Sequence, residues 1–223
     1  MRIILLGAPG SGKGAVGDLI ERAYGFPRIA TGDLLRRAVQ ERTPLGQRAA
    51  DHMGRGGLVP DDLVVALVRE RLDVGDAQGG YILDGFPRTI AQARSLEALD
   101  PRRPEVAIDI EADEATIVRR LEARRLCPRC AAVYNLRSRP PRREDVCDAD
   151  DEPLVPRDDD RPDIVQNRLR IYHQQTEPLV AYYASKGILH KVAGNGTVDE
   201  TFAQVRPILD RALAGAGKEQ TAR

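Results

Sequence analysis

The sequence predicts an α/β fold in which a parallel sheet is covered by helices on both faces. Short apolar runs with the length of buried strands recur along the chain, separated by segments with apolar residues at helical spacing. A glycine-rich turn joins the first apolar run to the first helical segment. Strands and helices that alternate in this way form parallel sheets, because each crossover helix packs back onto the sheet.

The individual elements follow from this periodicity. The expected strands are residues 3–6, 28–30, 81–84, 106–110 and 188–192. The expected helices are residues 13–24, 34–41, 61–72, 89–99, 115–125 and 198–213, and a long helix from Ile164 that we expect to be kinked at Pro178. Thr31-Gly32-Asp33 is expected to be a capping turn before the second helix. Ligands of such sheets bind beyond the carboxyl ends of the strands.

Three stretches depart from this pattern. Residues 43–60 are rich in glycine and small residues, which predicts a small helical excursion. Residues 126–160 have lost apolar periodicity and are dominated by proline, arginine and aspartate, which predicts an insertion into the α/β domain. Residues 214–223 have no apolar face, and we expect them to form a disordered tail.

The glycine-rich turn from Gly7 to Gly14 has the pattern of a phosphate-binding loop. The spacing from Gly7 to Gly12 and Lys13 fits G-x-x-x-x-G-K, in which backbone N–H groups surround phosphate oxygens. It predicts a nucleotide-binding, P-loop NTPase-type sheet; the alternative is a structural turn with a solvated lysine. Gly14 stands where most such loops carry a magnesium-binding Ser or Thr. Ser11 has no nearby histidine, which argues against a serine nucleophile.

The composition argues against several classes of protein. The 223 residues include 34 Lys and Arg and 34 Asp and Glu, so no basic field favours nucleic acid. No apolar run is long enough to cross a membrane. The first residues enter a strand directly, without the pattern of a signal peptide, so we expect a cytoplasmic location.

All three cysteines lie in the insertion. Cys127 and Cys130 form a C-x-x-C knuckle, and Cys147 with Asp150 forms a second knuckle whose last ligand is a carboxylate. Three thiolates and one carboxylate make a closed tetrahedral zinc shell, which would stabilise a segment with little apolar core. Neighbouring aspartates are alternatives to Asp150. The other interpretations are a redox pair, a disulfide, unrelated cysteines and a zinc ribbon that binds nucleic acid.

Six arginines lie beside these motifs or on helices that border the insertion. They are Arg36, Arg88, Arg120, Arg124, Arg157 and Arg168. Planar guanidinium groups match the charge and geometry of a phosphoryl group during its transfer. By residue type alone, however, each of these arginines is more often a solvated or salt-bridged surface residue.

The glycine loop, Thr31-Gly32-Asp33, the run Asp84-Gly85-Phe86-Pro87-Arg88 and residues 157–160 together resemble the adenylate kinases, in the long bacterial form with a zinc-bearing lid. The resemblance implies a core of residues 1–29, 60–122 and 161–213, an AMP-binding segment at 30–59 and a lid at 123–160. It also implies the reversible reaction ATP + AMP = 2 ADP, assisted by Mg²⁺, in a monomer that serves adenine nucleotide homeostasis.

The resemblance assigns roles to individual residues. The ATP-binding residues would be Gly10, Ser11, Gly12, Lys13, Gly14, Ala15, Arg120, Arg124, Val133, Tyr134 and Gly196. The AMP-binding residues would be Thr31, Arg36, Gly57, Leu58, Val59, Gly85, Phe86, Pro87, Arg88, Gln92, Arg157 and Arg168. Lys13, Arg88, Arg124, Arg157 and Arg168 would be catalytic. Cys127, Cys130, Cys147 and Asp150 would bind the structural zinc, and Asp84 would hold magnesium through water.

Two positions depart from the family pattern. The family usually has Thr where this chain has Ala15, so one hydroxyl group near a phosphate is missing. The aspartate pair after Arg157 is displaced by one position, because Asp158 precedes Asp159 and Asp160. The alternative functions are a kinase for UMP or CMP, a kinase that uses GTP, and a nucleotide-dependent zinc-ribbon protein that binds nucleic acid.

Overall fold

Five parallel strands form the central sheet of the protein. The computed structural model describes residues 1–101 and 103–221, with the backbone alone from 216 onward. The strand order is β2-β3-β1-β4-β7, and every pairing is parallel. The strands are β1 (Arg2–Leu6), β2 (Arg28–Ala30), β3 (Tyr81–Asp84), β4 (Glu105–Glu111) and β7 (Leu189–Ala193). This arrangement confirms the predicted fold class.

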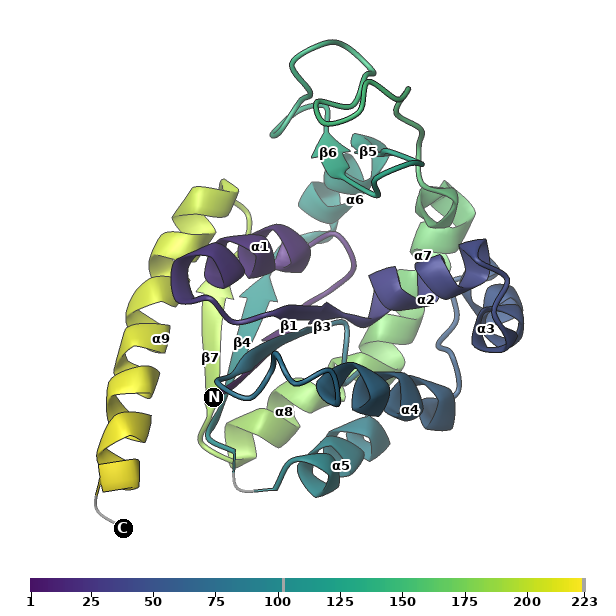
Figure 1. The fold of residues 1–223 in the computed structure, drawn as a ribbon. Coiled ribbons are helices and arrows are strands. Elements are labelled where there is room, and N and C mark those ends of the chain that lie inside the picture. Colours follow the sequence, from purple (N-terminus) through teal and green to yellow (C-terminus); the bar gives the residue numbers. More distant parts are fainter. Residues whose placement is uncertain (102, 222–223) are drawn as a thin grey trace.

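Helices cover both faces of the sheet (Figure 1). One face packs against α1 (Lys13–Tyr24) and α9 (Val198–Thr221), and the other against α4 (Asp61–Leu72), α5 (Ile90–Leu99) and α8 (Pro178–Ser185). Successive side chains of a strand point to opposite faces. In β1, Ile3 and Leu5 therefore pack toward the first pair of helices, while Ile4 and Leu6 pack toward the others.

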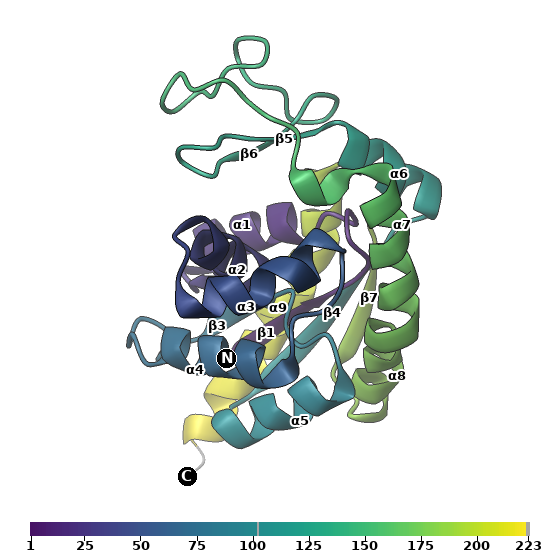
Figure 2. The same ribbon diagram turned by 90° about the vertical axis from the view of Figure 1, so that its right-hand side faces the viewer.

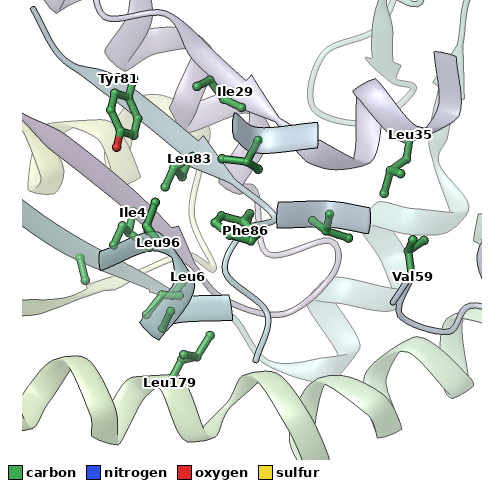
Figure 3. Packing of buried hydrophobic residues seen from close by; sticks show 14 of the residues in the cluster. Ile4, Leu6, Ile29, Leu35, Val59, Tyr81, Leu83, Phe86, Leu96 and Leu179 are labelled. Carbon is green, nitrogen blue, oxygen red and sulfur yellow. The ribbon is translucent and has the colours of Figure 1, made fainter. Parts of the chain in front are cut away.

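The predicted helical excursion of residues 43–60 contains the short helix α3 (Pro44–Gly54), which packs against the preceding helix α2 (Thr31–Gln40). Residues 31–60, between β2 and α4, are called the excursion below. The buried side chain of Phe86 joins this excursion to the sheet. Phe86 lies after the end of β3, between Leu83 on one side and Leu35 and Val59 on the other (Figure 3). The apolar core thus continues from the sheet into the excursion and fixes its position.

The insertion projects from one end of the molecule, beyond α6 (Glu114–Glu122) and α7 (Pro162–Ile171) (Figure 2). Its regular structure is a small antiparallel pair, β5 (Arg124–Leu126) and β6 (Val133–Asn135), and the 3₁₀ turn η1 (Asp158–Asp160). A small cluster of Cys127, Tyr134, Cys147 and Leu154 forms its interior. The insertion therefore has only a limited core of its own.

The structure corrects several predicted boundaries. Residues 31–33 form the first turn of α2 and not a capping turn, and α6 ends at Glu122 because the chain enters β5. The long helix is interrupted before Pro178 by a π-helical turn, η2 (Tyr172–Thr176), because proline offers no N–H and its ring crowds the preceding turn. Helix α9 continues to Thr221, past the predicted end at 213, and residues 222–223 of the predicted tail lie outside the described residues.

Within residues 1–101 and 103–221, no helix has the length and apolar character needed to cross a membrane.

Candidate active site

The loop between β1 and α1 has the backbone of an anion-binding turn. Gly7, Gly10 and Gly12 have φ values of 132°, 86° and 105°, a region that side chains with a Cβ rarely adopt. A Cβ on Gly7 would also lie 2.5 Å from the carbonyl oxygen of Ile110. These glycines allow the loop to turn sharply into the N-terminus of α1, where backbone N–H groups and the helix dipole favour an anion.

Lys13 turns back over this loop. Its Nζ donates to the carbonyl oxygens of Gly7 and Ala8 at 2.6 and 2.7 Å. Burial lowers the pKa of Lys13 to about 8; Asp84 opposes this shift and Arg88 adds to it. A negatively charged phosphate beside the loop would therefore be a strong partner for this ammonium group.

Arg120, on α6, ties the loop to the turn before α9. Its Nη1 donates to the carbonyl oxygen of Ser11 at 3.1 Å, and its Nη2 donates to that of Gly196 at 2.6 Å. Ser11, Arg120 and Gly196, which were all predicted to bind ATP, thus lie together although they are far apart in the sequence. Ala15 lies in the first turn of α1, close to the loop.

A pocket lies beside the carboxyl ends of β2 and β3, between the excursion and α7. Its lining comprises Thr31, Gly32, Leu35, Arg36, Met53, Gly56, Gly57, Leu58, Val59, Val64, Gly85, Arg88, Gln92, Asp159 and Arg168. Buried Thr31 is anchored there because its hydroxyl donates to the carbonyl oxygen of Gly85 at 2.9 Å. Arg88 Nε donates to the same oxygen at 2.8 Å. The pocket combines apolar walls with guanidinium groups, a composition that suits a nucleoside phosphate.

Gln92 forms the buried polar end of this pocket. Its Oε1 accepts from the backbone N–H of Arg88 at 2.7 Å, and its Nε2 donates to Asp61 Oδ1 at 2.7 Å. Asp61 also accepts from the hydroxyl of Thr89 at 2.9 Å, and Thr89 caps α5. An amide group has two hydrogens and two lone pairs, so one of each remains for a base edge.

An arginine cluster around Asp159 forms one wall of the pocket. Arg157 donates from Nε and Nη2 to the two carboxylate oxygens of Asp159, at 3.0 and 2.9 Å. Arg168 Nη1 lies 3.4 Å and Arg36 Nη1 lies 3.6 Å from Asp159 Oδ2. Burial alone would raise the pKa of Asp159, but Arg157 and Arg168 hold it well below its usual range. The forks that bind this carboxylate also match a phosphate group.

Arg124 and Asp160 extend the same cluster toward the insertion. Arg124 Nε donates to Asp160 Oδ2 at 2.6 Å, and Arg168 Nη1 donates to Asp160 Oδ1 at 3.1 Å. Burial lowers the pKa of Arg168 to about 10, although Asp159 opposes this shift. The aspartate pair that is displaced by one position from the family pattern thus supplies two carboxylates to the arginines.

The cysteines form the second polar centre of the molecule. One ligand atom from each of Cys127, Cys130, Cys147 and Asp150 lies within 4.8 Å of the others. The Sγ atoms of Cys130 and Cys147 are 3.5 Å apart, and Cys127 Sγ is 3.3 Å from Asp150 Oδ1. Thiolates that share a tetrahedral zinc lie about 3.8 Å apart, so this donor set fits zinc.

Neighbouring aspartates are engaged elsewhere. Asp148 Oδ1 accepts from the backbone N–H of Arg142 at 2.8 Å, and Asp151 pairs with Arg143. Among the three candidate aspartates, Asp150 is therefore the one that lies with the cysteines.

Comparison with known proteins identifies the family of this chain. The family model for adenylate kinase matches residues 5–188. The adenylate kinase of Lachnospira eligens is 46% identical over 212 residues, which cover 94% of this chain and 100% of that protein. The chain belongs to the adenylate kinase family.

Other adenylate kinases match over a similar length. That of Thermodesulfovibrio yellowstonii is 44% identical, with 95% of this chain and 100% of the relative covered. That of Archaeoglobus fulgidus is 42% identical, with coverage of 95% and 99%. Adenylate kinases are phosphotransferases with a phosphate group as acceptor, so the protein is an enzyme of this class. The alternative of a zinc-ribbon protein that binds nucleic acid is not favoured.

Most of the residues that meet at the glycine loop, the pocket and the cysteine cluster were predictable from the sequence, but two were not. These are Asp61, which accepts a hydrogen bond from Gln92, and Arg28, which donates one to Asp84 at 3.0 Å. Neither residue belongs to a recognisable motif. Tyr134, expected near ATP with Val133, directs its hydroxyl group to Cys147 Sγ at 3.5 Å and accepts from the N–H of Asp148 at 2.8 Å. Its side chain therefore belongs to the interior of the insertion.

Proposed function

We propose that the protein transfers the terminal phosphoryl group of ATP to AMP, and that the reverse reaction forms ATP and AMP from two ADP. The observation that carries this proposal is the arginine cluster around Asp159, three members of which line a pocket at the carboxyl ends of β2 and β3, in a chain that also carries a phosphate loop. A loop that binds the phosphates of one nucleotide and an arginine cluster that binds the phosphate of another would suit direct transfer between two nucleotides. The full-length similarity to adenylate kinases supports the same reaction.

ATP would be held by the loop residues 10–15, with its phosphates against the backbone N–H groups and Lys13. Arg120 and Gly196 would border the nucleoside end, together with the backbone of Val133 and Tyr134. Lys13 would place a positive charge beside the phosphates. The missing hydroxyl at Ala15 leaves the loop to bind mainly through backbone and lysine.

AMP would occupy the pocket lined by Thr31, Gly57–Val59, Gly85, Arg88 and Gln92, with its base edge toward the free donor and acceptor of Gln92. Phe86 and Pro87 would support it from behind the lining, as the residues between Gly85 and Arg88. The phosphate of AMP would enter the forks of Arg36, Arg88, Arg157 and Arg168. Because a phosphate monoester is already ionised near neutral pH, the transfer needs no strong general base. Arg124 and its neighbours would stabilise charge that spreads over the transferred group.

Magnesium, when bound with ATP, would supply charge neutralisation and orientation of the phosphates. Asp84 is the carboxylate at the carboxyl end of β3, beside Gly14 of the loop: a Cβ on Gly14 would lie 3.4 Å from Asp84 Oδ2. Carboxylate oxygens suit Mg²⁺, which commonly retains several water ligands. Asp84 therefore would hold the ion through water.

The proposed domain roles follow from the same assignment. Residues 30–59 would bind AMP, residues 123–160 would form a lid that closes over ATP and excludes water, and the remainder of 1–213 would be the core. Cys127, Cys130, Cys147 and Asp150 would hold a structural zinc in the lid. We further propose a monomer in the cytoplasm that serves adenine nucleotide homeostasis and binds no nucleic acid.

The proposal is tested by measuring ADP formation from ATP with AMP, UMP, CMP and GMP as acceptors, and with GTP in place of ATP. We expect AMP and ATP to give the highest kcat/KM. Comparable rates with UMP or CMP would favour the alternative kinase. Lys13→Met should lower kcat about 10²–10³-fold or more with the fold retained, because it removes a positive charge preorganised at the phosphates.

A further inference from the structure

Arg28 is the side chain that engages Asp84. Its Nη1 donates to Asp84 Oδ2 at 3.0 Å, and the two side chains are only 19% and 15% exposed. The same guanidinium group reaches two more carboxylates: Nη1 lies 3.6 Å from Asp33 Oδ2, and Nε lies 3.0 Å from Asp18 Oδ1. Arg28 thus connects the carboxyl end of β3 to α1 and α2.

Helix α1 is shaped to receive this arginine. A Cβ on Gly17 would lie 2.7 Å from Arg28 Cδ, and a Cβ on Gly14 would lie 3.9 Å from Arg28 Nη1. Residues three apart share one face of a helix. This glycine face leaves a groove in which the stem of Arg28 passes Gly17 and its charged end reaches the phosphate loop beside Gly14.

We propose that Arg28 is a positioning residue that competes with Mg²⁺ for Asp84, and so weakens the binding of Mg²⁺ to the enzyme–nucleotide complex. This inference rests on the proposed function and on Asp84 as the carboxylate nearest the metal. A guanidinium group in contact with a carboxylate reduces the negative potential that a divalent ion would find there. Neither Gly14 nor Ala15 offers a hydroxyl ligand that would compensate.

The same contact also orients the carboxylate. Lys13 and Arg88 are the other cations that act on this region, since the pKa of each responds to Asp84. Arg28 is distinguished from them by its direct hydrogen bond. Removal of Arg28 should therefore free Asp84 for the ion, while the cations that hold the nucleotide phosphates remain.

The test compares nucleotide binding with and without metal. The dissociation constant of a non-hydrolysable ATP analogue is measured calorimetrically in excess Mg²⁺ and in EDTA, and the ratio of the two constants gives the metal enhancement. In Arg28→Gln this enhancement should rise about tenfold, as expected for one unit charge removed a few Å from a divalent ion in a partly solvated site. The analogue should bind no more tightly in EDTA. Direct binding of Mn²⁺, followed by electron paramagnetic resonance, should tighten in parallel.

Three further variants make the result specific. Arg28→Lys retains the positive charge and should return the enhancement close to the wild-type value. Gly17→Ala changes no charge but displaces the arginine stem, so it should raise the enhancement in the same direction as Arg28→Gln. Arg71→Gln is the matched control, because Arg71 also forms an ion pair, with Nη1 2.6 Å from Asp76 Oδ1, but this pair lies outside the site. This variant should leave the enhancement unchanged.

An unchanged enhancement in both Arg28→Gln and Gly17→Ala would overturn the inference. So would an equal loss of binding in Mg²⁺ and in EDTA accompanied by a lower Tm, because that pattern identifies a purely structural arginine. Failure of the proposed function would appear differently, as an absence of ADP formation from ATP and AMP by the wild-type protein.

Discussion

Lys13 is held over its own loop by two carbonyl groups, and burial lowers the pKa of its ammonium group. Its pKa is lowered to about 8, so the free protein loses this charge as the pH rises through that value. A bound phosphate favours the protonated form and therefore raises the pKa. Binding must take up a proton above pH 8, and this cost grows with pH.

We accordingly expect the affinity for ATP to be flat below about pH 7 and to fall about tenfold per pH unit well above pH 8, until the pKa of the complex is reached. Calorimetry in buffers of different ionisation enthalpy should show uptake of up to one proton. Lys13→Arg is the matched control, because its charge is fixed throughout this range and the slope should vanish. An affinity that stays constant to pH 9.5 in the wild type would contradict the assignment.

Among the elements, the insertion of residues 123–160, which we propose as the lid, is the one that we expect to depend on a metal. Its interior consists of four residues, two of which are the cysteines at positions 127 and 147, and its strands are three residues long. Such a segment buries too little apolar surface to offset the entropy of ordering its loops. A zinc ion bound by the three cysteines and Asp150 would supply the remaining free energy needed to order this segment.

Removal of zinc with a chelator should therefore lower Tm by about 5–10 °C, which corresponds to about 2–3 kcal/mol in a chain of this size. Hydrogen exchange should accelerate first in residues 124–157, while the sheet stays protected. A Cys127→Ser, Cys147→Ser double variant should start from the lower Tm and show no response to the chelator. An unaltered Tm with no zinc found by elemental analysis would refute a structural metal.

The sequence alone predicts the strands of the sheet but not the contacts between distant side chains. Strands such as Tyr81–Asp84 were predictable because they are continuous apolar runs that any parallel sheet would bury. The contact of Arg28 with Asp84 was not, because it depends on the register that sets Ala30 beside Asp84, 54 residues along the chain. The hydrogen bond between Gln92 and Asp61 was not predictable for the same reason, because it joins two helices that are distant in the sequence. Local pattern predicts elements and loop motifs, whereas such partners are set by the packing of distant segments.

At the scale of the whole molecule, the proposed AMP site depends on how the excursion meets α7. Asn167 Nδ2 donates to the carbonyl oxygen of Arg55 at 2.5 Å, and Arg36 reaches Asp159 from α2. The backbone between these contacts passes very close to α7. A Cβ on Gly56 would lie 2.9 Å from both Arg168 Cγ and Ile164 Cγ2. Glycine at this position therefore allows the excursion to pack closely against α7 beside the pocket.

Gly56→Ala should open this junction. Gly56 has a φ of 69°, so alanine adds a backbone penalty of about 1–2 kcal/mol to the steric conflict with Arg168. We expect KM for AMP to rise about tenfold, while KM for ATP changes less than about twofold, because the glycine loop is untouched. Gly25→Ala is the matched control: its φ is 70°, but a Cβ there meets nothing within 4 Å. The control should share the loss of stability and retain both KM values. Equal changes in both KM values, or an unaltered KM for AMP, would show that closure of the excursion onto α7 does not govern AMP binding.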